Sequence, residues 1–205
     1  MILPVLAAGL AFPQYKLDPA GNAPSELAPA VSATLNQPGT KILNSDGSLL
    51  CEVWMRKEVP AGTGSAEPNV AFPSIPHGAL LGAIRFTTNG SDRRGQTLKP
   101  GVYTLRYSLY PVDGAHQGVA PQRDFLILVR AEDDTDPAAL PSYDELMNWS
   151  RKASGTPHPA VLSIATPLED APNPGFVKEG EQDWMFNTKV GATPMGIILV
   201  GTFEG

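Results

Sequence analysis

The chain has 205 residues, 42% of them apolar and 18% charged, and its 21 prolines and 20 glycines favour many short elements joined by turns. The formal net charge is −6 and no more than two basic residues are adjacent, which excludes the basic stripe that nucleic-acid binding needs. One cysteine, Cys51, excludes an intrachain disulfide.

An uncharged apolar stretch at residues 2–12 comes first along the chain. It is shorter than the roughly 20 residues that a helix needs to cross a bilayer, so we predict no transmembrane span. The stretch is typical of the apolar region of a signal peptide, although no Lys or Arg precedes it, and a buried first strand is the alternative. We therefore expect residues 1–12 to be a signal peptide or N-terminal hydrophobic segment, and the protein to be periplasmic or extracellular.

Polar residues rich in Pro, Gly and Asn follow, and we expect residues 13–36 to form a linker with a short helical stretch. The folded domain is then expected at residues 37–205. It begins with a hairpin, because Asp46-Gly47 can supply the positive φ of a tight turn and apolar and polar side chains alternate over residues 48–57.

The middle of the chain predicts three further strands after a long loop. Residues 58–78 carry four prolines and no periodicity, which indicates an irregular surface segment. The strands are expected at three places: residues 80–88, residues 101–110 with Tyr103, Leu105, Tyr107 and Leu109 on one face, and residues 125–129, which are apolar on both faces and so central.

One helix and four more strands complete the prediction. Ser142 and Glu145 have the spacing of a capping box, and Gly155 is placed to end the helix. Strands are expected at residues 160–165, 176–178, 184–190 and 195–203. Runs of strands without alternating helices predict a mainly β fold, an antiparallel β-sandwich of jelly-roll or Ig-like type with one short inserted helix near residues 142–154.

The stretch from Gln96 to Tyr107 contains the segment Pro100-Gly101-Val102-Tyr103-Thr104-Leu105. This segment resembles the P-G-x-Y-x-L strand entry of uncharacterised exported bacterial β-sandwich proteins. The resemblance covers about residues 78–130 and implies a fold. It implies no activity and no site residues, because a fold does not fix a function.

Histidines are the first candidates for chemistry. His77, His116 and His158 all lie in predicted loops beside Gly or Pro, and imidazole is a common metal ligand. One hypothesis pairs His116 with His158 in a metal or acid–base site near Asp113 or Asp124. The other interpretation is that all are loop histidines with structural roles, since no two have short ligand spacing.

Four residues are the candidates for binding. Arg106 lies on the polar face of the clearest predicted strand, and Arg123-Asp124 precedes the neighbouring strand. They could close a hairpin as an Arg–Asp pair or contact an anionic ligand. Trp54 alternates with Glu52 and Arg56, so it is either covered by the helix or exposed as a contact for a partner.

The residues contain no nucleophile elbow, phosphate-binding loop or short-spaced metal motif. We therefore expect a non-enzymatic exported binding or accessory module that contacts a protein partner or a glycan and could serve in a larger envelope complex. No cofactor is predicted. The alternatives are a metal-binding protein or metalloenzyme that uses the loop histidines, and a carbohydrate-binding module that uses Trp54 and neighbouring aromatic residues.

Overall fold

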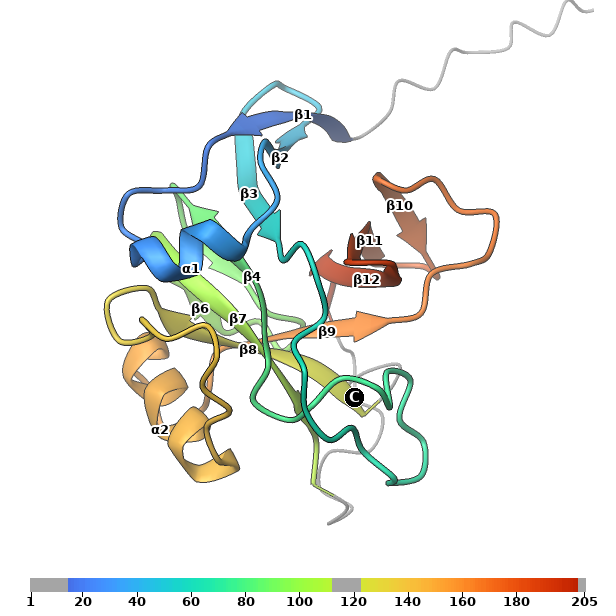
Figure 1. Cartoon of the computed structure of the whole chain (residues 1–205). Coiled ribbons are helices and arrows are strands. Elements are labelled where there is room, and N and C mark those ends of the chain that lie inside the picture. The colour runs from blue at the N-terminus through green and yellow to red at the C-terminus, as the bar shows by residue number, and fades with distance from the viewer. Residues whose placement is uncertain (1–14, 112–122, 203–205) are drawn as a thin grey trace, which may run out of the picture.

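The computed structural model describes residues 15–111 and 123–202, so the predicted signal peptide at residues 1–12 lies outside the described part of the chain. Strands dominate the structure (Figure 1). The strands of the first half are β1 (Tyr15–Gly21), β2 (Gly39–Asn44), β3 (Leu49–Met55), β4 (Leu80–Phe86), β5 (Gly90–Ser91), β6 (Thr97–Leu98) and β7 (Gly101–Leu109).

The second half adds five strands and the longer of the two helices. The strands are β8 (Asp124–Arg130), β9 (Val161–Ala165), β10 (Gly175–Glu179), β11 (Asp183–Val190) and β12 (Thr193–Val200). The helices are α1 (Pro29–Thr34) and α2 (Tyr143–Ser154). No helix within residues 15–111 and 123–202 is long and apolar enough to cross a membrane.

Ten of the strands form one antiparallel sheet in the order β1-β2-β3-β4-β7-β8-β9-β12-β11-β10, and β5 pairs only with β6. The first seven of these ten follow one another as a meander. The chain then crosses from β9 to β10 and returns through two hairpins, so that β12 pairs with β9.

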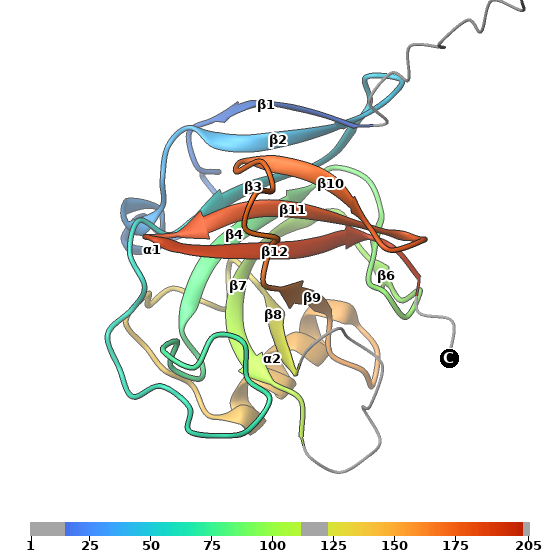
Figure 2. The same cartoon turned by 90° about the vertical axis from the view of Figure 1, so that its right-hand side faces the viewer.

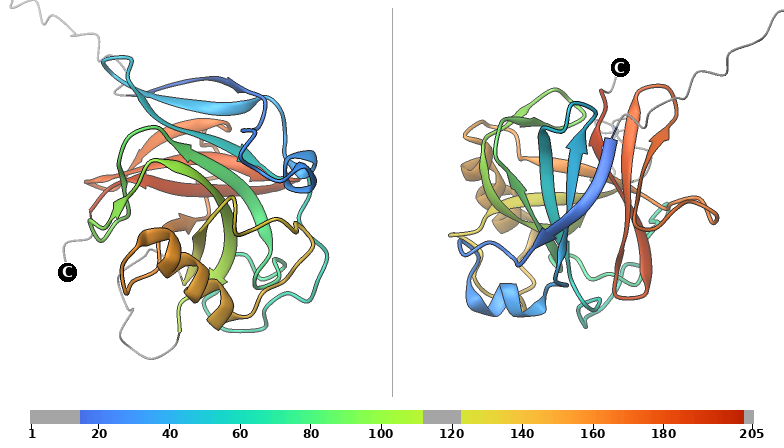
Figure 3. Two further views of the ribbon diagram at one scale, coloured as in Figure 1. Left: turned by 90° about the vertical axis from the view of Figure 1, so that its left-hand side faces the viewer. Right: turned by 90° about the horizontal axis from the view of Figure 1, so that it is seen from above.

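The two edges of this sheet approach each other, and the sheet is nearly barrel-shaped (Figures 2 and 3). The contact is aromatic: the Tyr15 ring of β1 lies 4.7 Å from the Phe176 ring of β10 and 4.8 Å from the Trp184 ring of β11, centroid to centroid. The predicted mainly β class and antiparallel pairing are therefore confirmed. The sandwich is not confirmed, because the strands belong to one continuous sheet.

The interior of the sheet holds the main core. Tyr103, Leu105 and Tyr107 of β7 point into it, as their spacing predicts, and so does Phe186 of β11. Cys51 is also buried in this core, and its burial raises the pKa of the thiol far above the ordinary range. Cys51 is therefore a packing residue.

The outer face of the sheet is covered in two places. Helix α2 packs on β8 through Leu146 and Met147, and its capping box forms as predicted: Ser142 Oγ accepts from the N–H of Glu145, and Glu145 Oε2 accepts from the N–H of Ser142 at 2.9 Å. Gly155 ends the helix at φ 70°. Helix α1 covers Trp54 of β3.

The short helical stretch predicted within residues 13–36 is present as α1, but the linker prediction missed strand β1, which joins the sheet. Strand β1 pairs with β2 from Tyr15↔Asn44 to Gly21↔Gly39. It is an edge strand whose side chains are exposed or half-buried, and it contains Pro19. It therefore lacks the apolar alternation by which the inner strands are recognised.

Candidate functional site

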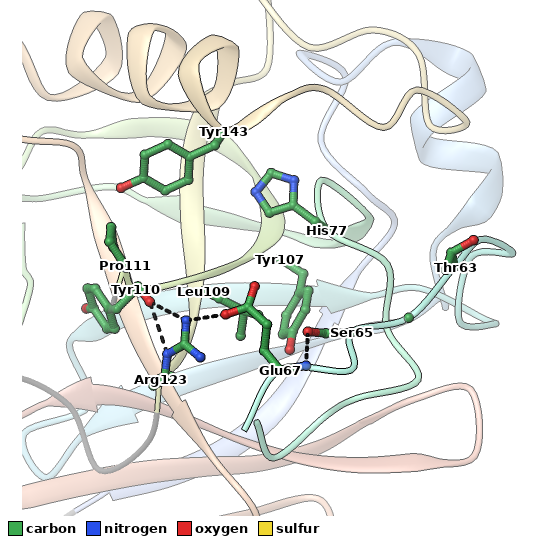
Figure 4. Close-up of a pocket in the computed structure, with 11 residues that line it drawn as sticks. Thr63, Ser65, Glu67, His77, Tyr107, Leu109, Tyr110, Pro111, Arg123 and Tyr143 are labelled. Carbon is green, nitrogen blue, oxygen red and sulfur yellow. Dashed lines mark hydrogen bonds and ion pairs between the residues drawn. The ribbon is translucent and has the colours of Figure 1, made fainter. Parts of the chain in front are cut away.

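A pocket of about 680 Å³ lies at one end of the sheet, between the loop before β4, the adjoining ends of β7 and β8, and the start of α2 (Figure 4). Its volume is within the range of about 300–1,000 Å³ typical of ligand sites, and the mouths of β-barrels are a common place for such sites. The lining residues are Thr63, Gly64, Ser65, Glu67, His77, Tyr107, Leu109, Tyr110, Pro111, Arg123 and Tyr143.

One wall of the pocket is a loop that Asp124 fastens to the sheet. The buried Asp124 carboxylate accepts the N–H of Ala71 at 2.9 Å, the N–H of Phe72 at 3.1 Å and the hydroxyl of Tyr107 at 2.6 Å. Burial and the hydrogen bond to Asp124 raise the pKa of Tyr107 far above its usual range. Asp124 therefore holds this wall of the pocket in place from behind and does not itself line the pocket.

An ion pair crosses the pocket. Arg123 Nη2 donates to Glu67 Oε2 at 2.7 Å, and the same guanidinium donates to the carbonyls of Tyr110 and Pro68. The Arg123 side chain is 18% exposed and that of Glu67 is 54% exposed. Figure 4 shows the Glu67 carboxylate pointing into the open space of the pocket. Arg123, a predicted binding residue, therefore lies in the candidate site, and its partner is Glu67 rather than the adjacent Asp124.

His77 faces this ion pair from the other side of the pocket (Figure 4). Its Nε2 lies 3.0 Å from the Oγ of Ser108, and its ring centroid lies 6.3 Å from that of Tyr143. Burial lowers the pKa of His77, against the opposing effects of the Pro141 carbonyl and the Glu67 charge, and so favours the neutral imidazole. Because Ser108 is fully buried and does not line the pocket, the Ser–His contact presents no nucleophile to a substrate.

Arg106 lies outside this pocket, buried on the outer face of β7. It pairs with Asp134, and its five N–H groups all donate, to the Asp134 carboxylate and to the carbonyls of Gly78, Asp136 and Ala139. The suggested pairing of Arg106 with Asp124 is therefore wrong, and no N–H group of Arg106 is left for an anionic ligand.

Trp54 is fully buried, so the interpretation of this residue as an exposed partner contact is wrong. Its Nε1 donates to the carbonyl of Gly21 at 3.1 Å, and the Arg85 guanidinium lies 5.8 Å from the centre of its ring. Helix α1, rather than the predicted α2, covers it. The carbohydrate platform suggested around Trp54 is therefore inaccessible.

The predicted metal pair is only partly described. His116 lies outside the described residues, while His158 is exposed and bonds through its backbone to Ser154 and Thr156. Among residues 15–111 and 123–202, no three His, Cys, Asp or Glu side chains gather to hold a metal ion. A metal site that uses His116 and His158 stays a prediction.

Several residues of the pocket lie in segments that sequence patterns do not place near one another. Glu67 and His77 lie in an aperiodic loop, and Tyr143 is the first residue of α2. His77 was already a candidate as one of the three loop histidines, whereas the one signal for Glu67 was the unusual length of its loop, since long loops in compact domains are often functional. Comparisons of the chain with protein-family models, curated proteins and solved structures found no match.

Proposed function

We propose that this chain is a non-enzymatic exported binding protein that takes a small ligand in the pocket at the end of its sheet. One observation carries the proposal: aromatic rings and a few hydrogen-bonding groups converge on one concave space, held by strand ends and a capped helix. Export is supported by the apolar composition of residues 2–12.

The chemistry of the lining supports binding over catalysis. Glu67 is held by Arg123, and the Nε2 of His77 is held by a buried hydroxyl. A nucleophile needs access to the substrate, and the hydroxyl beside His77 is the buried Ser108, which does not line the pocket. The charged groups of the lining, Glu67 and Arg123, form an ion pair, which suits recognition of a ligand.

The pocket can be tested without knowing the ligand. A fragment library of neutral and charged aromatic and polyol compounds would be titrated into the ¹⁵N-labelled chain, and amide shifts would be mapped onto the structure. We expect the shifts to concentrate at residues of the pocket, such as Ser65, His77 and Arg123. Shifts scattered over the surface, or none at fragment solubility, would refute a ligand pocket here.

Export is tested separately. Expression of the whole chain in a bacterium, followed by fractionation and intact-mass measurement, should place the protein outside the cytoplasm with its first residues removed. A protein of full mass that stays in the cytoplasm would contradict export and leave the pocket proposal to its own test.

A further inference from the structure

We infer that the pocket binds a neutral, hydroxyl-rich ring, such as a sugar residue of a glycan. This inference rests on the proposed function and names the ligand class for the same site. It transfers the suggested carbohydrate recognition from Trp54, which is buried, to the tyrosines that line the pocket, of which Tyr143 is exposed.

The charges in the pocket cancel one another. Glu67 and Arg123 are paired at 2.7 Å, and the burial of His77 favours its neutral form. An anionic ligand would be attracted by Arg123 but repelled by the Glu67 carboxylate beside it. A cationic ligand would be attracted by Glu67 but repelled by Arg123. A neutral polar ligand gains from both groups without breaking the pair.

The ion pair still offers one donor and one acceptor side by side. Of the five N–H groups of Arg123, four donate to Glu67, Tyr110 and Pro68, and one on Nη1 makes no hydrogen bond to the described residues. Glu67 Oε1 likewise accepts none within residues 15–111 and 123–202. Two neighbouring hydroxyls of a sugar can accept from the first and donate to the second.

Aromatic rings complete the match. Tyr107, Tyr110 and Tyr143 all line the pocket. Tyr107 and Tyr110 are buried in its wall, where Tyr110 stacks on Phe125 with 4.2 Å between ring centroids, so Tyr143 is the ring open to a ligand. Tyr143 is 37% exposed at the rim. An aromatic face presents apolar surface with a negative potential, which suits the C–H face of a pyranose ring.

The test titrates the whole chain with methyl glycosides of glucose, galactose, mannose and N-acetylglucosamine, and with acetate and tetramethylammonium as charged probes. We expect at least one glycoside to shift pocket amides in a saturable way, and neither ion to do so. Pocket binding of charged probes or aromatic fragments without any glycoside would overturn this inference and leave the proposed function standing. If no compound bound the pocket, both would fall.

Two variants test the contacts, and each has a matched control. Tyr143→Ala removes a rim ring and should weaken glycoside binding about tenfold, whereas Leu168→Ala, at an exposed apolar residue outside the pocket, should not.

Glu67→Gln should weaken glycoside binding by a similar factor and, because Arg123 loses its counter-charge, should create measurable acetate binding. Exposed Glu181→Gln should do neither. Unchanged glycoside binding in both Tyr143→Ala and Glu67→Gln would place the ligand elsewhere and overturn the inference.

Discussion

Arg106 and Asp134 form a buried two-pronged ion pair, with Nη2 to Oδ1 and Nε to Oδ2 both at 2.7 Å. The same guanidinium donates through Nη1 to the carbonyls of Gly78 and Ala139. Gly78 follows His77, and Ala139 lies four residues before Tyr143. One buried arginine therefore fixes the spacing between two walls of the candidate pocket, although it touches neither the pocket nor a ligand.

Asp134→Ala should lower the free energy of unfolding by about 3–5 kcal/mol, because it leaves the Arg106 charge buried and unpaired. Urea denaturation followed by tryptophan fluorescence measures this loss. The control is Asp133→Ala one residue earlier, where the partner Lys152 has a side chain 65% exposed. That variant should lose no more than about 1 kcal/mol. Equal losses of unfolding free energy in the two variants would show that the buried Arg106–Asp134 pair stabilises the fold no more than the exposed Asp133–Lys152 pair does.

Gly39→Ala should destabilise the fold although it adds only one methyl group. A Cβ at Gly39 would lie inside van der Waals contact of the Trp54 indole, which is fully buried and cannot move outward beneath α1. Overpacking of this kind costs about 1–3 kcal/mol. Thermal unfolding would measure it, with Thr40→Ala at a half-buried neighbour as the control. A Gly39→Ala variant as stable as the parent would mean that Trp54 has room to shift.

Local rules predicted much of the fold. Period-two alternation placed β7, and the Ser142–Glu145 spacing placed the start of α2. These signals lie within one element, and each is read from neighbours two to four positions apart. The sequence did not predict strand β1. Its side chains are exposed or half-buried because it is an edge strand, so it does not need alternating apolar residues.

Long-range relationships could not be predicted in the same way. Arg106 was recognised as a polar residue on a strand, but its partner Asp134 lies 28 positions away in a segment that crosses the outer face of the sheet. Likewise, Glu67 and Arg123 are 56 positions apart and meet where the loop before β4 is hydrogen-bonded to Asp124 at the start of β8. The charge of Arg123 suggested that it would pair with an acidic group. Only the tertiary fold identifies that group as Glu67.

Ser142→Ala should cost about 1 kcal/mol by removing the N-cap acceptor of α2. The cost should depend on pH through Glu145, whose pKa is lowered by hydrogen bonds from the Ser142 side chain and backbone. A lowered pKa in the folded state stabilises the protein above the unfolded value near 4.5, and this stabilisation is lost as the pH falls through the folded value. The difference between Ser142→Ala and the parent should therefore shrink in acid.

Urea titrations of parent and variant at neutral and acid pH would measure that difference. Exposed Ser74→Ala serves as the control and should match the parent at every pH. A cost of Ser142→Ala that stayed constant down to pH values well below that of a free glutamate would mean that Glu145 does not share in the cap.

Tyr107→Phe should change the stability of the protein in two separable ways. At neutral pH it removes the 2.6 Å hydrogen bond to Asp124, and a lost bond to a charged acceptor costs about 1.5–3 kcal/mol. At alkaline pH it should reduce the sensitivity of stability to pH. The pKa of Tyr107 is raised in the folded state, so its stabilising contribution is complete below the unfolded value near 10 and is lost as the pH rises above it.

The parent should therefore lose up to about 1.4 kcal/mol of stability per pH unit through Tyr107 above that value, and the variant should lack this part of the slope. Buried Tyr103 and Tyr110, whose pKa values are also raised by burial, keep some slope in both proteins. Urea midpoints at several alkaline pH values would measure the two slopes. Parallel slopes would mean that the Tyr107 hydroxyl reaches solvent, and the wall that Asp124 holds against the sheet would then be looser than its hydrogen bonds imply.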